Sequence, residues 1–107
     1  RPEMGRVAAA GADAVYITSD NPRWESAADI LQAITAGAPA ARVIEERALA
    51  IQQVIAEAAA EDVVLLAGKG HETEQEIRGQ RYPFDDAVHA KAALAAWNER
   101  QLAGAEV

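Results

Sequence analysis

The sequence contains no cysteine and few aromatic residues. Of its 107 residues, 5% are aromatic and none is cysteine. Without cysteine, the chain has no disulfides, thiolate metal sites or cysteine nucleophiles. No apolar run approaches the ~20 residues of a membrane-spanning helix, so we expect no membrane partner. Two histidines, His71 and His89, do not by themselves make a familiar zinc site.

Basic residues are also scarce. Lys and Arg number 10 against 17 Asp and Glu, which gives a net charge of -7. A chain this acidic lacks the basic face that nucleic-acid binding requires, so we expect no nucleic-acid partner. Half of the residues are hydrophobic and 25% are charged, proportions that are typical of a globular domain. The length fits one small domain.

The hydrophobic pattern alternates between helical and strand periods. Helical spacing of apolar residues predicts four helices, over 3–11, 27–36, 46–60 and 86–101. β-rich runs predict short strands over 14–18, 42–45 and 63–67, and a hairpin over 75–84. The run 63–67 is apolar on both faces, as at the centre of a parallel sheet. We therefore expect an α/β fold, a Rossmann-like three-layer domain with a mostly parallel sheet plus a β-hairpin.

Polar residues mark where the helices begin. Ser26 and Asp85 are residue types that cap the free N–H groups of a helix. Asp85-Asp86 also fits paired carboxylates for acid–base chemistry, although a helix start suits this pair better. Glu45-Glu46-Arg47 is interpreted as a solvated helix start. On the last helix, His89 is expected to be a surface or packing residue, and a core stripe is expected at Val88, Ala92, Ala95 and Trp97.

The loop Asp20-Asn21-Pro22-Arg23 follows the first expected strand. Ligand loops of parallel α/β domains lie at such carboxyl ends of strands. Arg presents a planar fork that meets a carboxylate or phosphate with two hydrogen bonds. Asn adds a donor and an acceptor, Pro stiffens the loop, and Asp can orient the Arg or meet an ammonium group. The same residues also fit an Asx-type turn followed by a solvated Arg.

A second loop, Gly68-Lys69-Gly70-His71-Glu72, follows the run 63–67. Its two glycines let the backbone turn tightly and approach a ligand closely. The spacing is that of neither a Walker A loop nor a dinucleotide-binding loop. Glu72 suits an ammonium group, His71 suits a hydrogen bond or a proton transfer, and Lys69 suits a phosphate. The other reading is a plain strand-to-loop turn with an exposed Lys69.

Together, the two loops resemble the C-terminal domain of the Mur ligases, in particular the members that add meso-diaminopimelate. The resemblance lies in Thr18-Ser19-Asp20-Asn21-Pro22-Arg23 followed by Leu66-Ala67-Gly68-Lys69-Gly70-His71-Glu72. Two further segments support it, namely Arg1-Pro2 with Met4-Gly5, and Arg81-Tyr82-Pro83-Phe84-Asp85-Asp86. The similarity covers most of the chain, and both motifs occur in the family's order.

The resemblance implies a cytoplasmic role in peptidoglycan precursor synthesis. In such ligases, ATP with Mg²⁺ phosphorylates the terminal carboxylate of UDP-N-acetylmuramoyl-L-alanyl-D-glutamate, and the amine of the diamino acid attacks the acyl phosphate. The central domain binds ATP and Mg²⁺, and the C-terminal domain binds the amino acid. The whole chain, 1–107, is then expected to be this C-terminal domain without its first strand. As a fragment it is expected to be inactive as a ligase, to hold no cofactor or metal, and to self-associate through the exposed sheet edge.

The resemblance also assigns site residues. Asp20, Asn21, Pro22 and Arg23 match the diaminopimelate-recognition motif, and Gly68 and Glu72 match residues that contact the amino acid, with Lys69 and His71 as accessory positions. Meso-diaminopimelate differs from lysine by one carboxylate, which Arg23 and Asn21 are suited to hold. A site built for a polar group rejects the analogue that lacks it.

Other readings remain open at this point. The chain also fits the C-terminal domain of a lysine-adding Mur ligase or of a folylpolyglutamate synthetase, although the Asp20–Arg23 quartet argues against both. A non-catalytic α/β ligand-binding module is a third reading. This reading predicts that Arg23 or Glu72 of the motifs is replaced by another residue type, and the sequence retains both.

Overall fold

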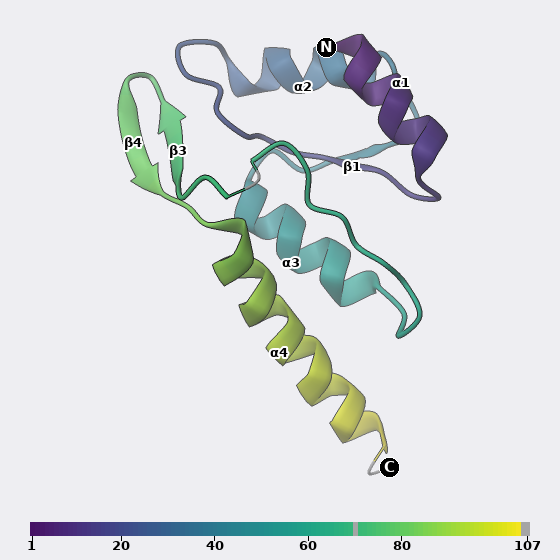
Figure 1. Cartoon of the computed structure of the whole chain (residues 1–107). Helices are drawn as coiled ribbons and strands as arrows, with labels where there is room; N and C mark the ends of the chain where they lie inside the picture. The colour runs from purple at the N-terminus through teal and green to yellow at the C-terminus, as the bar shows by residue number, and fades with distance from the viewer. Residues whose placement is uncertain (70, 106–107) are drawn as a thin grey trace.

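The computed structural model describes residues 1–69 and 71–105. The elements within them are, in chain order, α1 (Pro2–Gly11), β1 (Tyr16–Ile17), α2 (Ala27–Thr35), β2 (Arg42–Val43), α3 (Arg47–Glu57), β3 (Glu74–Ile77), β4 (Gln80–Pro83) and α4 (Asp86–Ala105). In Figure 1, α1 and α2 lie on one side of β1, and α3 and α4 lie on the other side. The α/β class and the positions of all the predicted helices are confirmed.

The first two strands pair in parallel, and Ile17 lies opposite Val43. Both strands are shorter than the predicted ranges 14–18 and 42–45. Backbone contacts nevertheless continue past them, because the Ser19 N–H donates to the Glu45 carbonyl at 3.3 Å. The chain therefore leaves this small sheet at Asp20, where the first candidate loop begins.

The predicted hairpin is confirmed. β3 and β4 pair antiparallel, with Ile77 opposite Gln80. Arg78 and Gly79 form the turn between them, and Gly79 has a φ of +76°, which glycine adopts without steric cost. In Figure 1, the hairpin projects from the body of the fold next to the start of α4.

The prediction of a central strand over 63–67 is wrong for this structure. These residues form no regular secondary structure, although their side chains alternate. Val64 and Leu66 pack into the core, whereas Val63 and Leu65 are 94% and 85% exposed. Within residues 1–69 and 71–105, no strand pairs with this segment, and a strand exists through its pairing. The alternation follows from the sequence, but the pairing does not.

Two clusters form the core. Ile17, Leu31 and Ala38 fill the space between β1 and α2. Ile51 and Ile55 of α3 pack on Ala93 of α4 in the second cluster. Two glycines bring α1 against α2, since a Cβ on Gly5 would overlap the carbonyl of Ile34, and a Cβ on Gly37 would overlap the carbonyl of Pro2.

The predicted helix caps are confirmed. The Asp29 N–H donates to the Ser26 side chain at 3.4 Å at the start of α2. Before α4, the Ala87 N–H donates to the Asp85 carboxylate at 2.9 Å. His89 stacks on Phe84 with ring centroids 4.3 Å apart, so its predicted packing role is also confirmed.

The predicted core stripe of α4 is wrong except at Trp97. Val88 is 62% exposed, and Ala92 and Ala95 are exposed as well. The residues that pack toward α3 are Ala90, Ala93 and Trp97, which have helical spacing. Because alanines occur on most faces of α4, the spacing of its apolar residues does not single out one buried face. The face that is buried is the one that contacts α3. The Trp97 indole donates to the Ala58 carbonyl at 2.9 Å.

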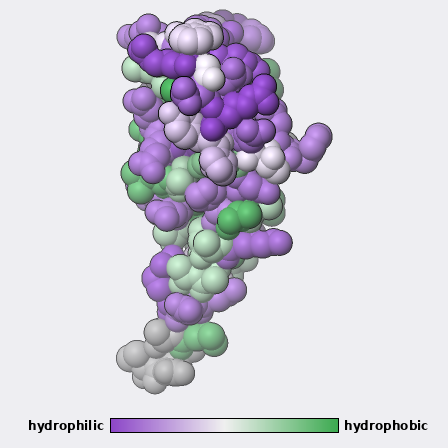
Figure 2. Space-filling view, turned by 90° about the vertical axis from the view of Figure 1, so that its left-hand side faces the viewer, coloured by the Kyte–Doolittle hydropathy of each residue, from purple (hydrophilic) through white to green (hydrophobic). Residues whose placement is uncertain are grey.

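One face of the molecule is shown in Figure 2. Its upper part is mostly hydrophilic, and hydrophobic side chains gather in its lower part. Across residues 1–69 and 71–105, no helix has both the length and the apolar character that a membrane span requires.

Candidate functional site

The loop Asp20–Arg23 is held along the hairpin. The Arg23 N–H donates to the Glu76 carbonyl at 3.0 Å, and the Arg78 N–H donates to the Arg23 carbonyl at 2.5 Å. These bonds form a parallel bridge between Arg23 and Ile77. They hold Arg23 at a φ of 55°, a costly conformation for a residue with a Cβ. Strain of this kind is often found at functional sites.

Side-chain contacts from β3 add to this support. Gln75 Nε2 donates to the Asp20 carbonyl at 2.7 Å, and the Glu76 N–H donates to Asn21 Oδ1 at 2.9 Å. Pro22 is buried, so the loop has little freedom to move. Sequence reasoning missed Gln75 and Glu76, because only the fold brings the hairpin next to a loop more than 50 residues earlier.

Glycine at position 68 shapes the second loop. Its φ is +101°, which strongly favours glycine. A Cβ at this position would lie 3.5 Å from Asp20 Oδ2. The turn therefore brings the second loop against the first one. After it, the Glu72 N–H donates to the Lys69 carbonyl at 3.1 Å, and His71 is exposed. Gly70 lies outside the described residues.

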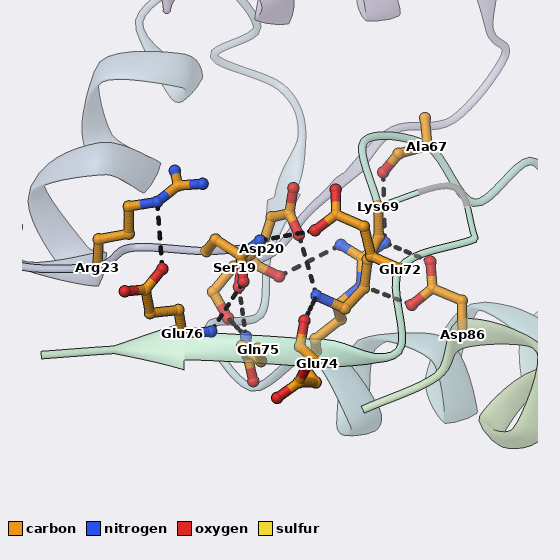
Figure 3. Close-up of polar contacts among 12 residues, drawn as sticks. Ser19, Asp20, Arg23, Ala67, Lys69, Glu72, Glu74, Gln75, Glu76 and Asp86 are labelled. Atoms are coloured by element: carbon orange, nitrogen blue, oxygen red, sulfur yellow. Dashed lines mark hydrogen bonds and ion pairs between the residues drawn. The ribbon is translucent and has the colours of Figure 1, made fainter. Parts of the chain in front are cut away.

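Lys69 points into the protein, so its interpretation as an exposed residue is wrong. Its side chain has no exposed surface. The ammonium group donates to the Glu74 carbonyl at 2.6 Å and lies 3.4 Å from Asp20 Oδ1. It also lies 5.8 Å from the centroid of the Phe84 ring. Lys69 thus ties the second loop to both the first loop and the hairpin (Figure 3).

The two candidate loops meet at Asn21 and Glu72. Asn21 Nδ2 donates to Glu72 Oε2 at 3.0 Å. With its Oδ1 bonded to β3, the Asn21 amide is fixed at both ends. Glu72 is largely exposed, and its carboxylate keeps capacity for a further donor. A carboxylate held in this way suits an ammonium group of a ligand.

The Arg23 side chain leaves the loop toward solvent. Its Nε lies 3.4 Å from Glu76 Oε2, and the side chain is 64% exposed. Figure 3 shows Arg23 at one end of the group and Glu72 nearer its centre. A guanidinium that meets Glu76 through Nε has two further nitrogens with which to bind a carboxylate. The surface thus offers a cationic fork and an anion within one group of residues.

Beneath the loops, Arg47 and Asp86 form a buried ion pair, which sequence reasoning missed. Arg47 Nε and Nη2 donate to the two Asp86 oxygens at 2.8 and 2.6 Å. Arg47 was expected to be solvated, yet its side chain is 5% exposed. Hydrogen bonding to Asp86 raises the pKa of Arg47 despite the opposing effect of burial, and the charges of Asp20 and Glu72 contribute. A charged residue at a helix start gives no sequence signal of burial.

Comparison with known proteins identifies the family. The model of the Mur ligase glutamate ligase domain matches residues 1–70. The chain belongs to the Mur ligase family. The matched residues include the loop Asp20–Arg23 as well as Gly68 and Lys69, and they confirm the resemblance drawn from the two motifs. Glu72 lies just beyond them.

Curated Mur ligases are similar to the chain over most of its length. The UDP-N-acetylmuramoyl-L-alanyl-D-glutamate–2,6-diaminopimelate ligase of Acidovorax sp. (strain JS42) is 54% identical over 98 residues, which are 89% of this chain and 20% of that protein. The ligase of the same name from Pseudomonas aeruginosa is 51% identical over 100 residues, which are 91% of this chain and 20% of that protein. The chain thus spans about a fifth of the length of these relatives.

A solved structure supports the fold. A UDP-N-acetylmuramoyl-L-alanyl-D-glutamate–2,6-diaminopimelate ligase superposes with a TM-score of 0.83 at 42% sequence identity. The match covers 92% of this chain and 21% of that one. The Mur ligase fold assigned to the sequence is therefore confirmed in three dimensions.

An open cleft of about 850 Å³ lies beside the first loop of this Mur ligase domain. Among the described site candidates, Pro22 alone lines it, together with residues that include Glu25, Arg47 and His89. Asn21, Arg23 and Glu72 lie outside the lining, so the cleft is not the meeting point of the loops. The described part of the chain holds no group of three or more His, Asp or Glu residues suited to a metal ion.

Proposed function

We propose that residues 1–107 form the C-terminal, amino-acid-binding domain of a meso-diaminopimelate-adding Mur ligase. The observation that carries the proposal is the contact between Asn21 and Glu72, which joins the two family motifs into one surface. The names of the similar ligases, which specify 2,6-diaminopimelate, support the same substrate. The proposal places the full-length enzyme in the cytoplasm.

In this proposal, the far carboxylate of meso-diaminopimelate binds Arg23, and Asn21 positions the neighbouring polar groups. Arg23 is suited to this role because its fork forms paired hydrogen bonds with a carboxylate. Glu72 accepts a hydrogen bond from an ammonium group of the ligand. Gly68 keeps the second loop close enough to the first for both charges to reach one small zwitterion. Asp20 and Pro22 shape the loop, and His71 is accessory.

The full-length enzyme would join this amino acid to a nucleotide-linked dipeptide. The terminal carboxylate of UDP-N-acetylmuramoyl-L-alanyl-D-glutamate would be phosphorylated by ATP with release of ADP. The amine of the diamino acid would then displace phosphate from this acyl phosphate to form the amide. ATP and Mg²⁺ supply this activation in the full-length enzyme. The residues of this chain contribute by binding and orienting the amino acid.

The test is the ratio of kcat/KM for meso-diaminopimelate to that for L-lysine in the full-length ligase that contains this chain. Lysine leaves the Arg23 fork without its anion, so we expect a preference of orders of magnitude for meso-diaminopimelate. Arg23→Lys keeps the charge but loses the fork, and it should lower the ratio by about tenfold or more.

Arg78→Lys is the matched control, because Arg78 is exposed in the adjacent hairpin turn and should leave the ratio unchanged. Equal use of both amino acids by the unmodified enzyme would overturn the proposal, and a preference for lysine would favour a lysine-adding ligase instead. A ratio that Arg23→Lys does not alter would remove Arg23 from the site.

A further inference from the structure

One buried side chain bonds the base of both candidate loops. Arg47 Nη1 donates to the Ser19 carbonyl at 3.2 Å, and Nη2 donates to the Ala67 carbonyl at 3.3 Å. Ser19 directly precedes Asp20, and Ala67 directly precedes Gly68. The two segments are far apart in the sequence, and the Arg47 guanidinium donates hydrogen bonds to both of them.

Asp86 fixes the orientation of that guanidinium. Two bonds, at 2.8 and 2.6 Å, hold Arg47 Nε and Nη2 against the two carboxylate oxygens. The side chains of Arg47 and Asp86 are 5% and 8% exposed, so solvent hardly competes for these bonds. Because the guanidinium is planar, fixing it on Asp86 also fixes the directions in which it donates to the two loops. Figure 3 shows Ala67 and Asp86 on the same side of the group.

We propose that Arg47 and Asp86 are positioning residues that set the spacing between the loop Asp20–Arg23 and the loop Gly68–Glu72. Neither residue reaches the ligand surface. They act through the carbonyls of Ser19 and Ala67, and thereby on where Asn21 and Glu72 meet. The inference rests on the proposed function, because it treats that meeting point as the amino-acid site.

If Arg47 and Asp86 served only to hold the helices together, the bonds from Arg47 to the two loop carbonyls would have no role. Burying two charges costs desolvation, and apolar residues of similar volume often replace such a pair without loss of stability. Apolar side chains would hold α3 against α4 equally well. They would not donate to the carbonyls of Ser19 and Ala67, and those two bonds connect the pair to the loops.

The test uses the double variant Arg47→Met/Asp86→Leu, which keeps volume and avoids an unpaired buried charge. Arg47→Lys is the second variant, since it keeps the charge but lacks the planar fork. Glu3→Gln is the matched control, because it breaks an exposed arginine–carboxylate pair with Arg6 on α1, an element that contributes no residue to either loop.

The first readout needs no ligand. Amide hydrogen exchange is measured by NMR on the isotope-labelled chain at Ser19 and Glu72, whose N–H groups are hydrogen-bonded, and at Ile55, which is buried in α3. We expect the double variant and Arg47→Lys to speed exchange at Ser19 and Glu72 by about tenfold relative to Ile55. The control should change none of them. Proportional changes at all three sites, or a change in one loop only, would overturn the inference.

The second readout is KM in the full-length ligase. The variants should raise KM for meso-diaminopimelate by about tenfold and leave KM for ATP unchanged. Equal changes in both KM values would contradict a positioning role. If the unmodified enzyme does not use meso-diaminopimelate, the proposed function fails, whereas the exchange measurement still decides whether Arg47 sets the loop spacing.

Discussion

Asn21 Nδ2 lies 3.0 Å from Glu72 Oε2 and so joins two loops whose residues are 51 positions apart in the sequence. The second atom of the same amide, Oδ1, accepts a hydrogen bond from the Glu76 N–H. Asn21 therefore fixes both the Glu72 carboxylate and its own loop. The charge pattern of the candidate site depends on this one amide.

Replacing Asn21 with Asp should weaken binding of meso-diaminopimelate. The variant loses the donor to Glu72 and places two carboxylates in contact, so the two side chains repel each other. Hydrogen bonds to charged groups contribute about 1.5–3 kcal/mol, which corresponds to a loss in affinity of about tenfold or more. Isothermal titration calorimetry measures it. Asn98→Asp, an exposed change on α4, is the control, and equal affinity in both variants would exclude Asn21 from the site.

Lys69→Met should lower stability, because the buried ammonium bonds the Glu74 carbonyl and lies beside Asp20. Methionine keeps the apolar stem but leaves that carbonyl without its donor. We expect a decrease of about 1–3 kcal/mol in the free energy of unfolding, measured by urea denaturation. Lys91→Met on the exposed side of α4 should have little effect. If Lys69→Met behaves like this control, the ammonium does not stabilise the junction of the loops.

The Glu57 carboxylate gives a pH dependence that can be checked directly. Hydrogen bonds from Tyr16, Arg42 and Gln53 lower its pKa from 4.5 to about 2. The folded state binds this proton more weakly than the unfolded state, so the stabilisation is complete above the ordinary pKa. It is lost as the pH falls through about 2.

Carboxyl ¹³C NMR of the folded chain measures this pKa. Urea unfolding of the unmodified chain and of Glu57→Gln, compared from neutral to acid pH, measures the linkage. We expect the stability difference between the two proteins to shrink as the pH falls. A Glu57 carboxyl that titrates at its ordinary value in the folded chain would contradict the hydrogen-bond arrangement around it.

The segment 63–67 should make the 107-residue chain self-associate. Val63 and Leu65 are exposed, and no described strand pairs with their backbone. Unpaired backbone N–H and C=O groups beside exposed apolar side chains can pair with the same segment of another copy. Light scattering should show a mass that rises with concentration. Val63→Lys/Leu65→Lys should keep the mass at that of a monomer, and Val88→Lys/Leu94→Lys on α4 should not. A constant monomer mass for the unmodified chain would refute this expectation.

Much of the fold follows from the sequence, for local reasons. The helices and the hairpin turn at Gly79 depend on periodicity, capping and turn residues that lie close together in the chain. The strand predicted over 63–67 failed because pairing depends on a neighbour, which local sequence does not reveal. The predicted buried face of α4 was wrong because an alanine-rich helix has similar apolar character on several faces.

The candidate site follows from the sequence only in part. Motif resemblance selects the loops that contain Asn21 and Glu72, and the structure brings them together. The roles of Arg47 and Lys69 do not follow, because long charged residues usually remain in solvent. Their burial depends on carbonyls and carboxylates from segments distant in sequence, as with Asp86, which meets Arg47 from 39 residues away.

The central claim is that the two loops form one recognition surface for meso-diaminopimelate. The most direct test is to titrate meso-diaminopimelate, and separately L-lysine, into the isotope-labelled chain and to follow the amide shifts by NMR. The account predicts shifts concentrated in residues 20–24 and 68–72 with meso-diaminopimelate and none of comparable size with lysine. Equal shifts with both amino acids, or shifts confined to other residues, would contradict it.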